Sequence, residues 1–207
     1  MATMVGPLTT VIAYLLGSIP FGYLLVRWRK RIDVRSTGSK SIGATNVLRN
    51  LGWGGFLVTF LLDFGKGVAA VVLTQKLTGN DPRWVAAAAV APLVGHCYPV
   101  FLKFRGGKAV ATAAGIYMVL APMSIGVALV IFAVLVGIWR YISVGSIVAT
   151  ACFPALVYYL HHPPWPIILA SGLGAALIIF RHRTNISRLL KGTEGRVGGK
   201  KAEVRSQ

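Results

Sequence analysis

The chain has 207 residues, of which 55% are hydrophobic and only 13% are charged. With a mean hydropathy of +0.68, it carries more apolar surface than one water-soluble core can bury, which argues against a soluble protein. Its 22 Lys and Arg against 5 Asp and Glu give a net charge of +17, a value typical of nucleic-acid-binding proteins. The basic residues lie between and after long apolar blocks, however, and this pattern indicates a polytopic membrane protein with no nucleic-acid partner.

Seven apolar segments predict an all-α fold with seven membrane-spanning helices. In chain order they cover residues 5–26, 53–77, 84–97, 109–121, 123–139, 142–160 and 165–180. The third and fourth are shorter than the about 20 residues that cross a hydrocarbon core, so a tilted, re-entrant or locally thinned arrangement is expected there. Pro122 is expected to separate the fourth and fifth as a hairpin, because proline breaks a helix interior. Residues 1–194 then form one membrane-embedded domain, and the Gly-rich, charged residues 195–207 are expected to be a disordered cytoplasmic tail.

The distribution of Lys and Arg predicts the orientation of these spans. Seven basic residues lie in segment 27–50 and eight lie after residue 180, and the positive-inside rule places both regions in the cytoplasm. With seven crossings and an outside N-terminus, segment 98–108 joins them. A five-span alternative, in which 84–97 does not cross and 109–139 is one helix, keeps the tail inside but moves 98–108 outside. The charge rule favours seven spans.

The loop after the first span contains a Gly- and Ser-rich segment, residues 33–49. Glycines allow close backbone approach, so consecutive N–H groups can form an anion-binding nest, to which hydroxyl and amide side chains add donors. A helix starting near Ala44 would add partial positive charge at the same place. The candidate phosphate-binding residues here are Gly38, Ser39, Ser41, Gly43, Thr45 and Asn46. The alternative, equally favoured by composition, is a turn whose cations touch anionic lipid headgroups.

A second cluster, Gly106-Gly107-Lys108, ends where a new apolar span begins. Two glycines and a cation at a helix start again suit an anion. The cluster is not a nucleotide-binding P-loop, because Leu102 and Ala109 stand where that motif requires Gly and Ser or Thr. The alternative is a set of positive charges that only caps a span.

The third cluster, residues 181–194, follows the last span. If it is helical, His182 and Asn185 are i, i+3 neighbours and can contact one ligand together. The basic surroundings favour the neutral form of His182, which is the form that a general base requires. The alternative is an amphipathic helix whose basic face lies on lipid headgroups.

Two opposite charges, Asp63 and Lys66, lie within the second predicted span. Charge is expensive there, so at a spacing of i, i+3 the two side chains are expected to pair or to face a polar cavity. A structural and a functional pair are equally compatible with the sequence.

Under the seven-span topology the three loop clusters share the cytoplasmic face, and each offers donors or cations to oxyanions. Together they predict that one or two phosphate-containing substrates bind at the cytoplasmic membrane surface.

These clusters, in this order, resemble the bacterial acyl-phosphate-dependent glycerol-3-phosphate acyltransferase family. The resemblance covers nearly the whole chain and rests on the motifs AYLLGSIPFG, GSKSIGATNVLRNLG, LDFGKG, GHCYPVFLKFRGGKAVAT, SVGSI and RHRTNISRLLKGTE. It implies a seven-span enzyme of the bacterial plasma or inner membrane that catalyses the first step of phospholipid biosynthesis. The implied substrates are acyl phosphate and sn-glycerol 3-phosphate, acylated at its 1-hydroxyl, and the implied products are lysophosphatidic acid and inorganic phosphate.

The resemblance also implies roles for individual residues. Ser39 and Arg49 match residues important for activity in the first motif, with Arg49 counted among both the catalytic and the phosphate-binding candidates. The second motif, matched by Gly106, Gly107 and Lys108, is implied to hold glycerol 3-phosphate. In the third motif His182 and Asn185 match the catalytic histidine and asparagine, and Glu194 matches a structural glutamate. Lys40-Ser41 departs from the family pattern, where Gly-Asn or a similar pair is usual, and it adds a cation to the loop.

The residue inventory fits this chemistry. Acyl phosphate has a good leaving group, so no covalent nucleophile, metal or cofactor is expected, and Cys97 and Cys152 have no metal-ligand spacing. The expected contribution of the protein is to position two phosphates and to supply charge, with the acyl tail between spans. His182 or a substrate phosphate oxygen can accept the hydroxyl proton, and the sequence does not choose between them.

The expected partners are the two substrates and membrane lipids, with no obligate protein partner. The rival function is a transporter or channel for a phosphorylated anion, which would use the same clusters with Asp63 and Lys66 along its path. The outward segments 78–83 and 161–164 carry few cations, so a through-path has little support. A scaffold for other lipid enzymes remains a third alternative.

Overall fold

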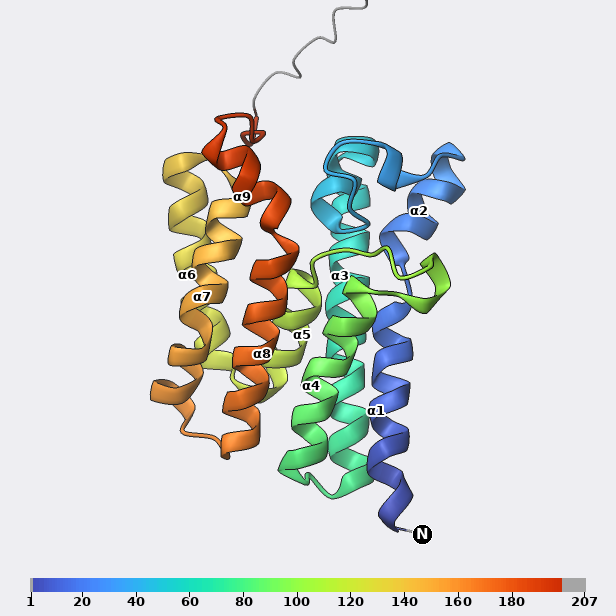
Figure 1. Cartoon of the computed structure of the whole chain (residues 1–207), viewed down its shortest axis with the longest axis vertical. Helices are drawn as coiled ribbons and strands as arrows, with labels where there is room; N and C mark the ends of the chain where they lie inside the picture. The colour runs from blue at the N-terminus through green and yellow to red at the C-terminus, as the bar shows by residue number, and fades with distance from the viewer. Residues whose placement is uncertain (1, 199–207) are drawn as a thin grey trace, which may run out of the picture.

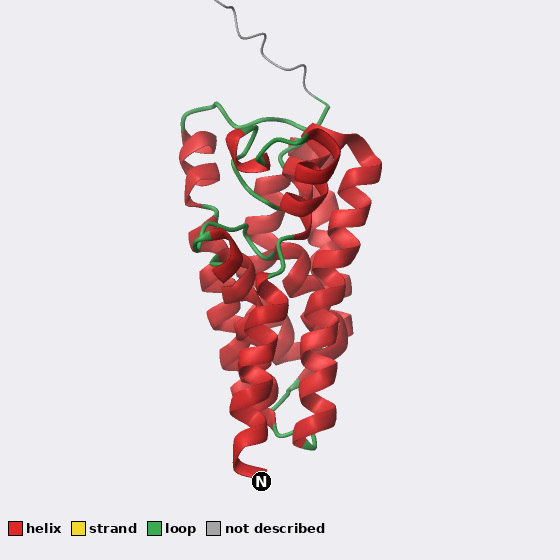
Figure 2. Ribbon diagram, turned by 90° about the vertical axis from the view of Figure 1, so that its right-hand side faces the viewer, coloured by secondary structure: helices red, strands yellow, loops and turns green. Residues whose placement is uncertain are grey.

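The computed structural model describes residues 2–198, which form a bundle of α-helices running along the long axis of the molecule (Figure 1). Loops gather at the two ends of this bundle (Figure 2). No strand occurs in the described residues, and the all-α class predicted from the sequence is confirmed. The elements are α1 Ala2–Ser18, α2 Phe21–Lys30, the 3₁₀ turn η1 Val34–Ser36, α3 Ala44–Thr78, α4 Pro82–Cys97, the 3₁₀ turn η2 Val100–Leu102, α5 Val110–Leu120, α6 Pro122–Trp139, α7 Ile142–His161, α8 Trp165–Arg181 and α9 Arg183–Leu190.

Five helical segments of the described chain are long and apolar enough to cross a membrane. They are Met4–Lys30, Ala44–Thr78, Pro82–Leu102, Pro122–Trp139 and Ile142–His161. Helices α8 and α9 meet the criterion only as a pair bent by 51°. Helix α5 has 11 residues, which span about 16 Å at 1.5 Å per residue, so its length does not establish a crossing. A multi-pass helical protein is therefore supported, and the number seven stays a prediction.

Prolines mark two of the helix boundaries. Helix α6 begins at Pro122, and Ala121, with φ −153°, separates it from α5, where the chain turns back (Figure 1). The predicted break is confirmed, and the single helix over 109–139 that the five-span alternative requires is not formed. The first predicted span, 5–26, is interrupted instead, because α1 ends before Pro20 and α2 begins after it.

A glycine bends the long helix α3 near its start. Gly52 has φ 72° and ψ −167°, a conformation that is open essentially only to glycine. The turns from Ala44 to Gly52 belong to the basic end of the molecule, and the second predicted span begins at residue 53, next to this kink.

Small residues let the helices approach closely. A Cβ on Gly17 would overlap the backbone of Pro92, so α1 lies directly against α4, and a Cβ on Gly115 would overlap the carbonyl of Phe64, so α5 lies against α3. Such contacts are typical of membrane helices, which have no hydrophobic driving force toward each other within lipid.

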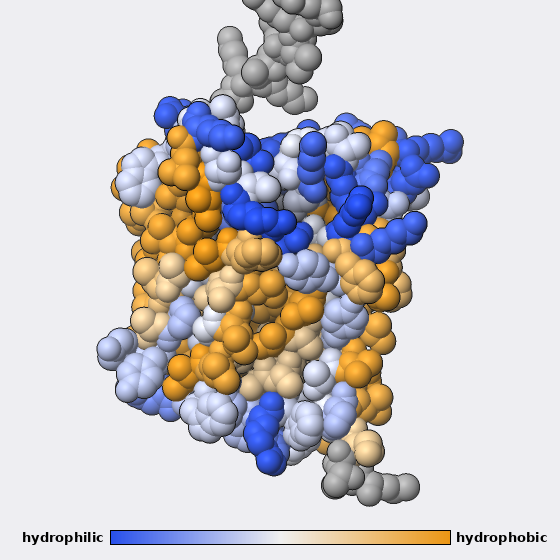
Figure 3. All heavy atoms as spheres, viewed as in Figure 1, coloured by the Kyte–Doolittle hydropathy of each residue, from blue (hydrophilic) through white to orange (hydrophobic). Residues whose placement is uncertain are grey.

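The two ends of the bundle differ in charge. Hydrophilic side chains gather over the upper end in Figure 3, above a broad apolar band. Helix α2, η1, the loop after α4 and helix α9 lie at this end, which we call the basic end, and the start of α1 lies at the other (Figure 1). Large apolar side chains such as Leu57, Val130 and Leu173 are exposed on the sides of the bundle, as expected for contact with lipid.

Most of the predicted disordered tail, 195–207, lies outside the described residues. Its first residues contact the start of α7: Val197 N–H donates to the carbonyl of Arg140 at 2.7 Å, and Arg196 Nε donates to the hydroxyl of Tyr141 at 3.0 Å. Disorder beyond residue 198 stays a prediction.

Candidate active site

Three segments that are far apart in the sequence meet at the basic end. Arg35 of the first loop donates from Nη1 to the carbonyl of Leu102 in the second, at 3.3 Å. Arg181, at the end of α8, donates from Nε to the carbonyl of Gly107 at 3.0 Å and from Nη2 to that of Gly106 at 3.1 Å. The three predicted clusters therefore share one end of the molecule and contact one another.

Asn46 organises the first loop from inside. Its Nδ2 donates to the carbonyls of Val34 (2.8 Å), Thr37 (3.1 Å) and Ser41 (2.9 Å), and its Oδ1 accepts from the N–H of Ser39 at 3.0 Å. The side chain is 1% exposed. Its amide is used up inside the loop, so the geometry does not support the predicted direct contact between Asn46 and phosphate.

Helix α3 starts at Ala44 with Gly43 as its N-cap, so the helix start considered in the sequence analysis is present. Gly38, with φ 53°, lies so close to Asn46 that a Cβ there would overlap Oδ1, and the same Cβ would lie 3.3 Å from Cδ of Arg49. Ser39 and Thr45 are half-buried and Arg49 is exposed, and Gly38 brings the loop close to the Arg49 side chain. Arg49 also reaches the third segment, since its Nη2 would lie 3.4 Å from a Cβ on Gly195.

The two glycines of the second cluster are packed on His96. The N–H of Gly107 donates to the carbonyl of His96 at 3.0 Å, and that of Gly106 donates to the carbonyl of Cys97 at 3.2 Å. The predicted nest of free amides is therefore not formed at these positions, because both hydrogens already have acceptors. The glycines are needed for space instead, since a Cβ on Gly107 would overlap the His96 ring. Of this cluster, Lys108 keeps donors for a ligand.

The Lys108 ammonium donates to Oδ1 of Asn185 on α9, and this is its one hydrogen bond within residues 2–198. Burial is the main reason that the pKa of Lys108 is lowered to about 8. The negative charge of Glu194 raises this pKa, and the positive charges of three arginines lower it further: Arg188, Arg49 and Arg181. Residues from all three clusters thus act on one cation. A half-buried ammonium that has three arginines and one carboxylate around it is short of negative charge, which is what a bound phosphate would supply.

Glu194 holds Asn185 in place. Its Oε1 accepts from Asn185 Nδ2 at 2.7 Å and from Ser143 Oγ at 2.8 Å, and its Oε2 accepts from Arg188 Nε at 2.7 Å. Burial alone would raise the pKa of Glu194, but these hydrogen bonds outweigh burial and hold it below the ordinary value. The carboxylate is therefore ionised and anchors the network. The sequence analysis did not predict the contact between Ser143 and Glu194, although Ser143 lies in one of the motifs that carry the resemblance.

His182 lies at the bend between α8 and α9 and is 3% exposed. Its Nδ1 is 2.8 Å from the carbonyl of Ile178. A carbonyl only accepts, so Nδ1 carries the hydrogen, and Nε2 of the neutral ring has a lone pair. Within the described residues Nε2 has no hydrogen-bond partner, which leaves it open to a substrate.

Asp63 and Lys66 form an ion pair, with Lys66 Nζ 2.7 Å from Asp63 Oδ1 and both side chains 2% exposed. Nζ also lies 3.0 Å from His96 Nδ1 and donates to the carbonyl of Ile19 at 3.0 Å. Ile19 precedes the proline break between α1 and α2, and its carbonyl also accepts from the N–H of Phe21 at 3.2 Å, so Lys66 is a second donor to the backbone at this break. The ion pair and Lys108 share no hydrogen-bond partner.

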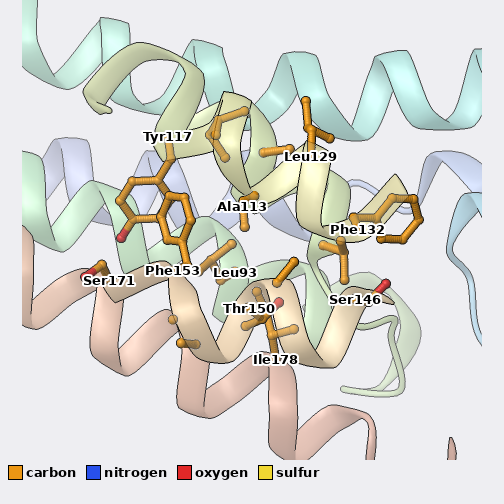
Figure 4. A pocket seen from close by; sticks show the side chains of 17 residues that line it. Leu93, Ala113, Tyr117, Leu129, Phe132, Ser146, Thr150, Phe153, Ser171 and Ile178 are labelled. Carbon is orange, nitrogen blue, oxygen red and sulfur yellow. The ribbon is translucent and has the colours of Figure 1, made fainter. Parts of the chain in front are cut away.

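An apolar cavity lies between α5, α6, α7 and α8 and has about 90 Å³ of free volume. Figure 4 shows Tyr117, Phe153 and Ser171 at one end and Phe132 and Ser146 at the other. The rings of Tyr117 and Phe153 have centroids 4.8 Å apart and close the first end.

The second end of the cavity adjoins the polar residues. Its wall includes Val110, which follows Lys108 by two residues, and Ile178, whose carbonyl accepts from His182. A space for an apolar chain thus begins next to the cations. In residues 2–198 no cluster of three or more His, Cys, Asp or Glu is arranged to hold a metal ion.

The chain is similar to known proteins over most of its length. A family described as glycerol-3-phosphate acyltransferase matches residues 7–192. Relatives with that name include one from Syntrophotalea carbinolica, 46% identical over 89% of this chain and 93% of the relative. Another, glycerol-3-phosphate acyltransferase 2 of Moorella thermoacetica, is 48% identical over 92% of this chain and 97% of the relative.

Solved structures agree with these relatives. The glycerol 3-phosphate form of PlsY (YgiH), an integral membrane glycerol 3-phosphate acyltransferase, superposes with a TM-score of 0.88 at 37% identity, covering 93% of this chain and 96% of that one. Its lysophosphatidic acid form gives a TM-score of 0.85 at 36% identity, covering 93% and 95%. The chain therefore belongs to the glycerol-3-phosphate acyltransferase family of integral membrane enzymes.

Proposed function

We propose that this acyltransferase takes its acyl group from acyl phosphate and binds both substrates at the basic end of the bundle. The 1-hydroxyl oxygen of glycerol 3-phosphate forms a bond to the acyl carbon, and the bond between that carbon and the phosphate oxygen breaks. The products are lysophosphatidic acid and inorganic phosphate. The observation that carries the proposal is the meeting of three cationic segments around Lys108, beside an apolar cavity.

The phosphate of glycerol 3-phosphate is assigned to Lys108, with Arg49 facing it from the first loop. A dianion there would satisfy the ammonium that now contacts the neutral amide of Asn185, and such charge-assisted contacts are the strong ones. The half-buried Ser39 and Thr45, with the N-terminus of α3, are assigned as donors to the second phosphate.

Some residues expected to bind phosphate receive another role. Asn46 shapes the first loop and Gly106 and Gly107 give the second loop its close packing, so all three are positioning residues. Gly38 and Gly43 belong to the same group, because they set the loop and the helix start beside Ser39.

Catalysis by this arrangement needs positioning and charge more than covalent chemistry. Holding both phosphates fixes the hydroxyl against the acyl carbonyl, and the cations stabilise the charge that passes to the leaving phosphate. Two acceptors are available for the hydroxyl proton: Nε2 of His182 and an oxygen of the leaving phosphate.

The acyl tail is placed in the apolar cavity, entering between Val110 and Ile178 and ending at Tyr117 and Phe153. Replacing Ala149, which lines the cavity on α7, by Phe should raise the KM for a long-chain acyl phosphate and leave the KM for glycerol 3-phosphate unchanged. Ala151→Phe, on the exposed side of the same helix, is the matched control. Equal effects of the two variants would place the tail elsewhere.

Seven crossings of a bacterial plasma or inner membrane are proposed, with the basic end in the cytoplasm. The two described ends of the chain lie at opposite ends of the bundle, which fits an odd number of crossings (Figure 1). The gathered Lys and Arg fit the positive-inside rule. Labelling of cysteines placed at residues 103–105, from each side of sealed vesicles, tests the orientation, and labelling from the outside would reverse it.

The purified protein, incubated with acyl phosphate and glycerol 3-phosphate, should release lysophosphatidic acid and phosphate in equal amounts. Acyl-CoA in place of acyl phosphate tests the donor, and turnover with acyl-CoA alone would overturn the donor assignment. A well-folded protein inactive with both donors would overturn the acyltransferase assignment. Uptake of glycerol 3-phosphate into proteoliposomes would then favour the transport alternative.

A further inference from the structure

A buried polar cluster adjoins the loop that carries Lys108. It consists of Asp63 and Lys66 on α3 and His96 on α4, which are 1%, 4% and 2% exposed. None of the three belongs to the catalytic or phosphate-binding residues assigned above. Ion pairs inside a membrane protein are expensive, and a buried pair is weak ground for stability because apolar residues of similar volume often match it. The cluster therefore calls for a role that apolar side chains could not fill.

Lys66 fixes the orientation of the His96 ring. Its ammonium meets the carboxylate of Asp63, the carbonyl of Ile19 and Nδ1 of His96, at 2.7, 3.0 and 3.0 Å. An ammonium only donates, so Nδ1 accepts and the ring hydrogen lies on Nε2. Thr112 Oγ1, in the first turn of α5, lies 3.4 Å from the same Nδ1.

The oriented ring is the surface on which Gly107 packs. A Cβ at Gly107 would overlap Nε2 of His96 and would lie 2.9 Å from its Cδ2. The backbone of His96 accepts from Gly107 N–H, and Arg181 holds the carbonyl of Gly107 from the other side. The peptide before Lys108 is thus held between an imidazole and a guanidinium.

We propose that the Asp63–Lys66–His96 cluster is a positioning device that sets where the Lys108 ammonium lies. Lys66 fixes the ring of His96, the ring fixes Gly107, and Gly107 fixes the residue that follows it. The inference rests on the proposed function in one respect, the assignment of the substrate phosphate to Lys108. His96 and Lys66 are positioning residues that act through the loop and do not touch substrate.

The first test is a double-mutant cycle in glycerol 3-phosphate binding, measured by calorimetry on detergent-purified protein. Gly107→Ala and His96→Ala should each weaken binding by about tenfold. The double variant should bind no more weakly than His96→Ala, because the added methyl then occupies the space that the ring leaves. Losses that multiply, or unchanged binding in folded His96→Ala, would overturn the proposal. Gly65→Ala, on α3 where a Cβ meets nothing within 4 Å, is the control.

The second test needs no substrate. The pH at which Lys108 becomes reactive toward an amine-acylating reagent is read by mass spectrometry, and it should lie near the pKa of about 8 in the natural chain. In Asp63→Asn/Lys66→Met, which removes both charges and keeps the side-chain volume, the midpoint should move toward the ordinary lysine value of 10.5 as the loop loosens. An unmoved midpoint in a folded double variant would overturn the positioning role. A moved midpoint in the double variant, together with a natural chain that does not bind glycerol 3-phosphate, would uphold the positioning role and reject the proposed function.

Discussion

Two lysines near the basic end, the buried Lys66 and the half-buried Lys108, differ in what surrounds their ammonium groups. Lys66 has three acceptors, one of them the carboxylate of Asp63. Lys108 has one hydrogen bond, to the neutral amide of Asn185, and it lies among several arginines whose charges oppose that of the single nearby carboxylate, Glu194. The difference teaches that a buried cation with a complete set of partners holds the structure, whereas one short of negative charge is placed to receive an anion.

The largest effect should come from removing Lys66. Lys66→Met leaves the Asp63 carboxylate buried without its cation, which costs about 3–5 kcal/mol of unfolding free energy. The double variant Asp63→Asn/Lys66→Met removes the orphaned charge and should recover most of that loss. Reversible unfolding in mixed micelles measures both variants. If the single variant were as stable as the double, the ion pair would not be what holds α3 to the α1–α2 break.

Removing Lys108 should weaken substrate binding without destabilising the fold. A charge-assisted contact is worth about 1.5–3 kcal/mol, so Lys108→Met should raise the KM for glycerol 3-phosphate about tenfold to a hundredfold. The melting temperature should stay the same or rise, because a poorly compensated cation is removed. Lys76→Met, on the exposed end of α3 away from the basic end, is the control. An unchanged KM with normal turnover would contradict the assignment of the substrate phosphate to Lys108.

The pH dependence of the same KM should follow the charge of Lys108. Burial, aided by the nearby arginines, lowers its pKa to about 8. The cationic form that attracts phosphate declines above that pH, so the KM should rise about fivefold between about pH 8 and pH 9. The rise should be missing in Lys108→Met. A variant that kept it would assign the titration to another group.

Raising the pH should stabilise the ligand-free fold, although it weakens the binding of glycerol 3-phosphate. The ordinary lysine pKa of 10.5 applies to the unfolded chain and lies above the value of about 8 in the folded protein. Between these values the unfolded state binds more protons, so the ligand-free protein should become more stable as pH rises from about 8 toward 10.5. Comparing the melting temperatures of the natural chain and Lys108→Met over this range isolates the contribution.

The sequence predicted most of the helix boundaries, because prolines and glycines punctuate its apolar runs. The predicted spans 142–160 and 165–180 correspond to Ile142–His161 and Trp165–Arg181, and the kink at Gly52 lies beside the predicted start at residue 53. The interruption at Pro20 was not predicted. An apolar run does not reveal that Lys66, far away in the sequence, donates to the carbonyl of Ile19 at this interruption.

The site was predictable in its outline and not in its hydrogen bonds. Residue types predicted three anion-binding segments, and the structure brings these segments together. Spacing could not indicate that the amides of Gly106 and Gly107 are taken by the backbone of α4, or that Asn46 turns inward. The hydrogen-bond partners of these groups depend on how distant segments pack together, and sequence spacing does not reveal that packing.

The smallest effect should come from Ser143→Ala, which tests whether Lys108 depends on its neighbours as Lys66 does. Ser143 gives Glu194 one of its hydrogen bonds from side chains, and Glu194 in turn holds Asn185 against Lys108. Losing one neutral donor costs about 1 kcal/mol, so kcat/KM for glycerol 3-phosphate should fall about threefold to fivefold. Ser146→Ala, one turn further along α7 and facing the apolar cavity, should change it less. Equal effects of the two variants would mean that the Glu194 network is not needed to position Lys108. The shortage of negative charge around Lys108 would then determine its binding of phosphate more than its hydrogen bond to Asn185 does.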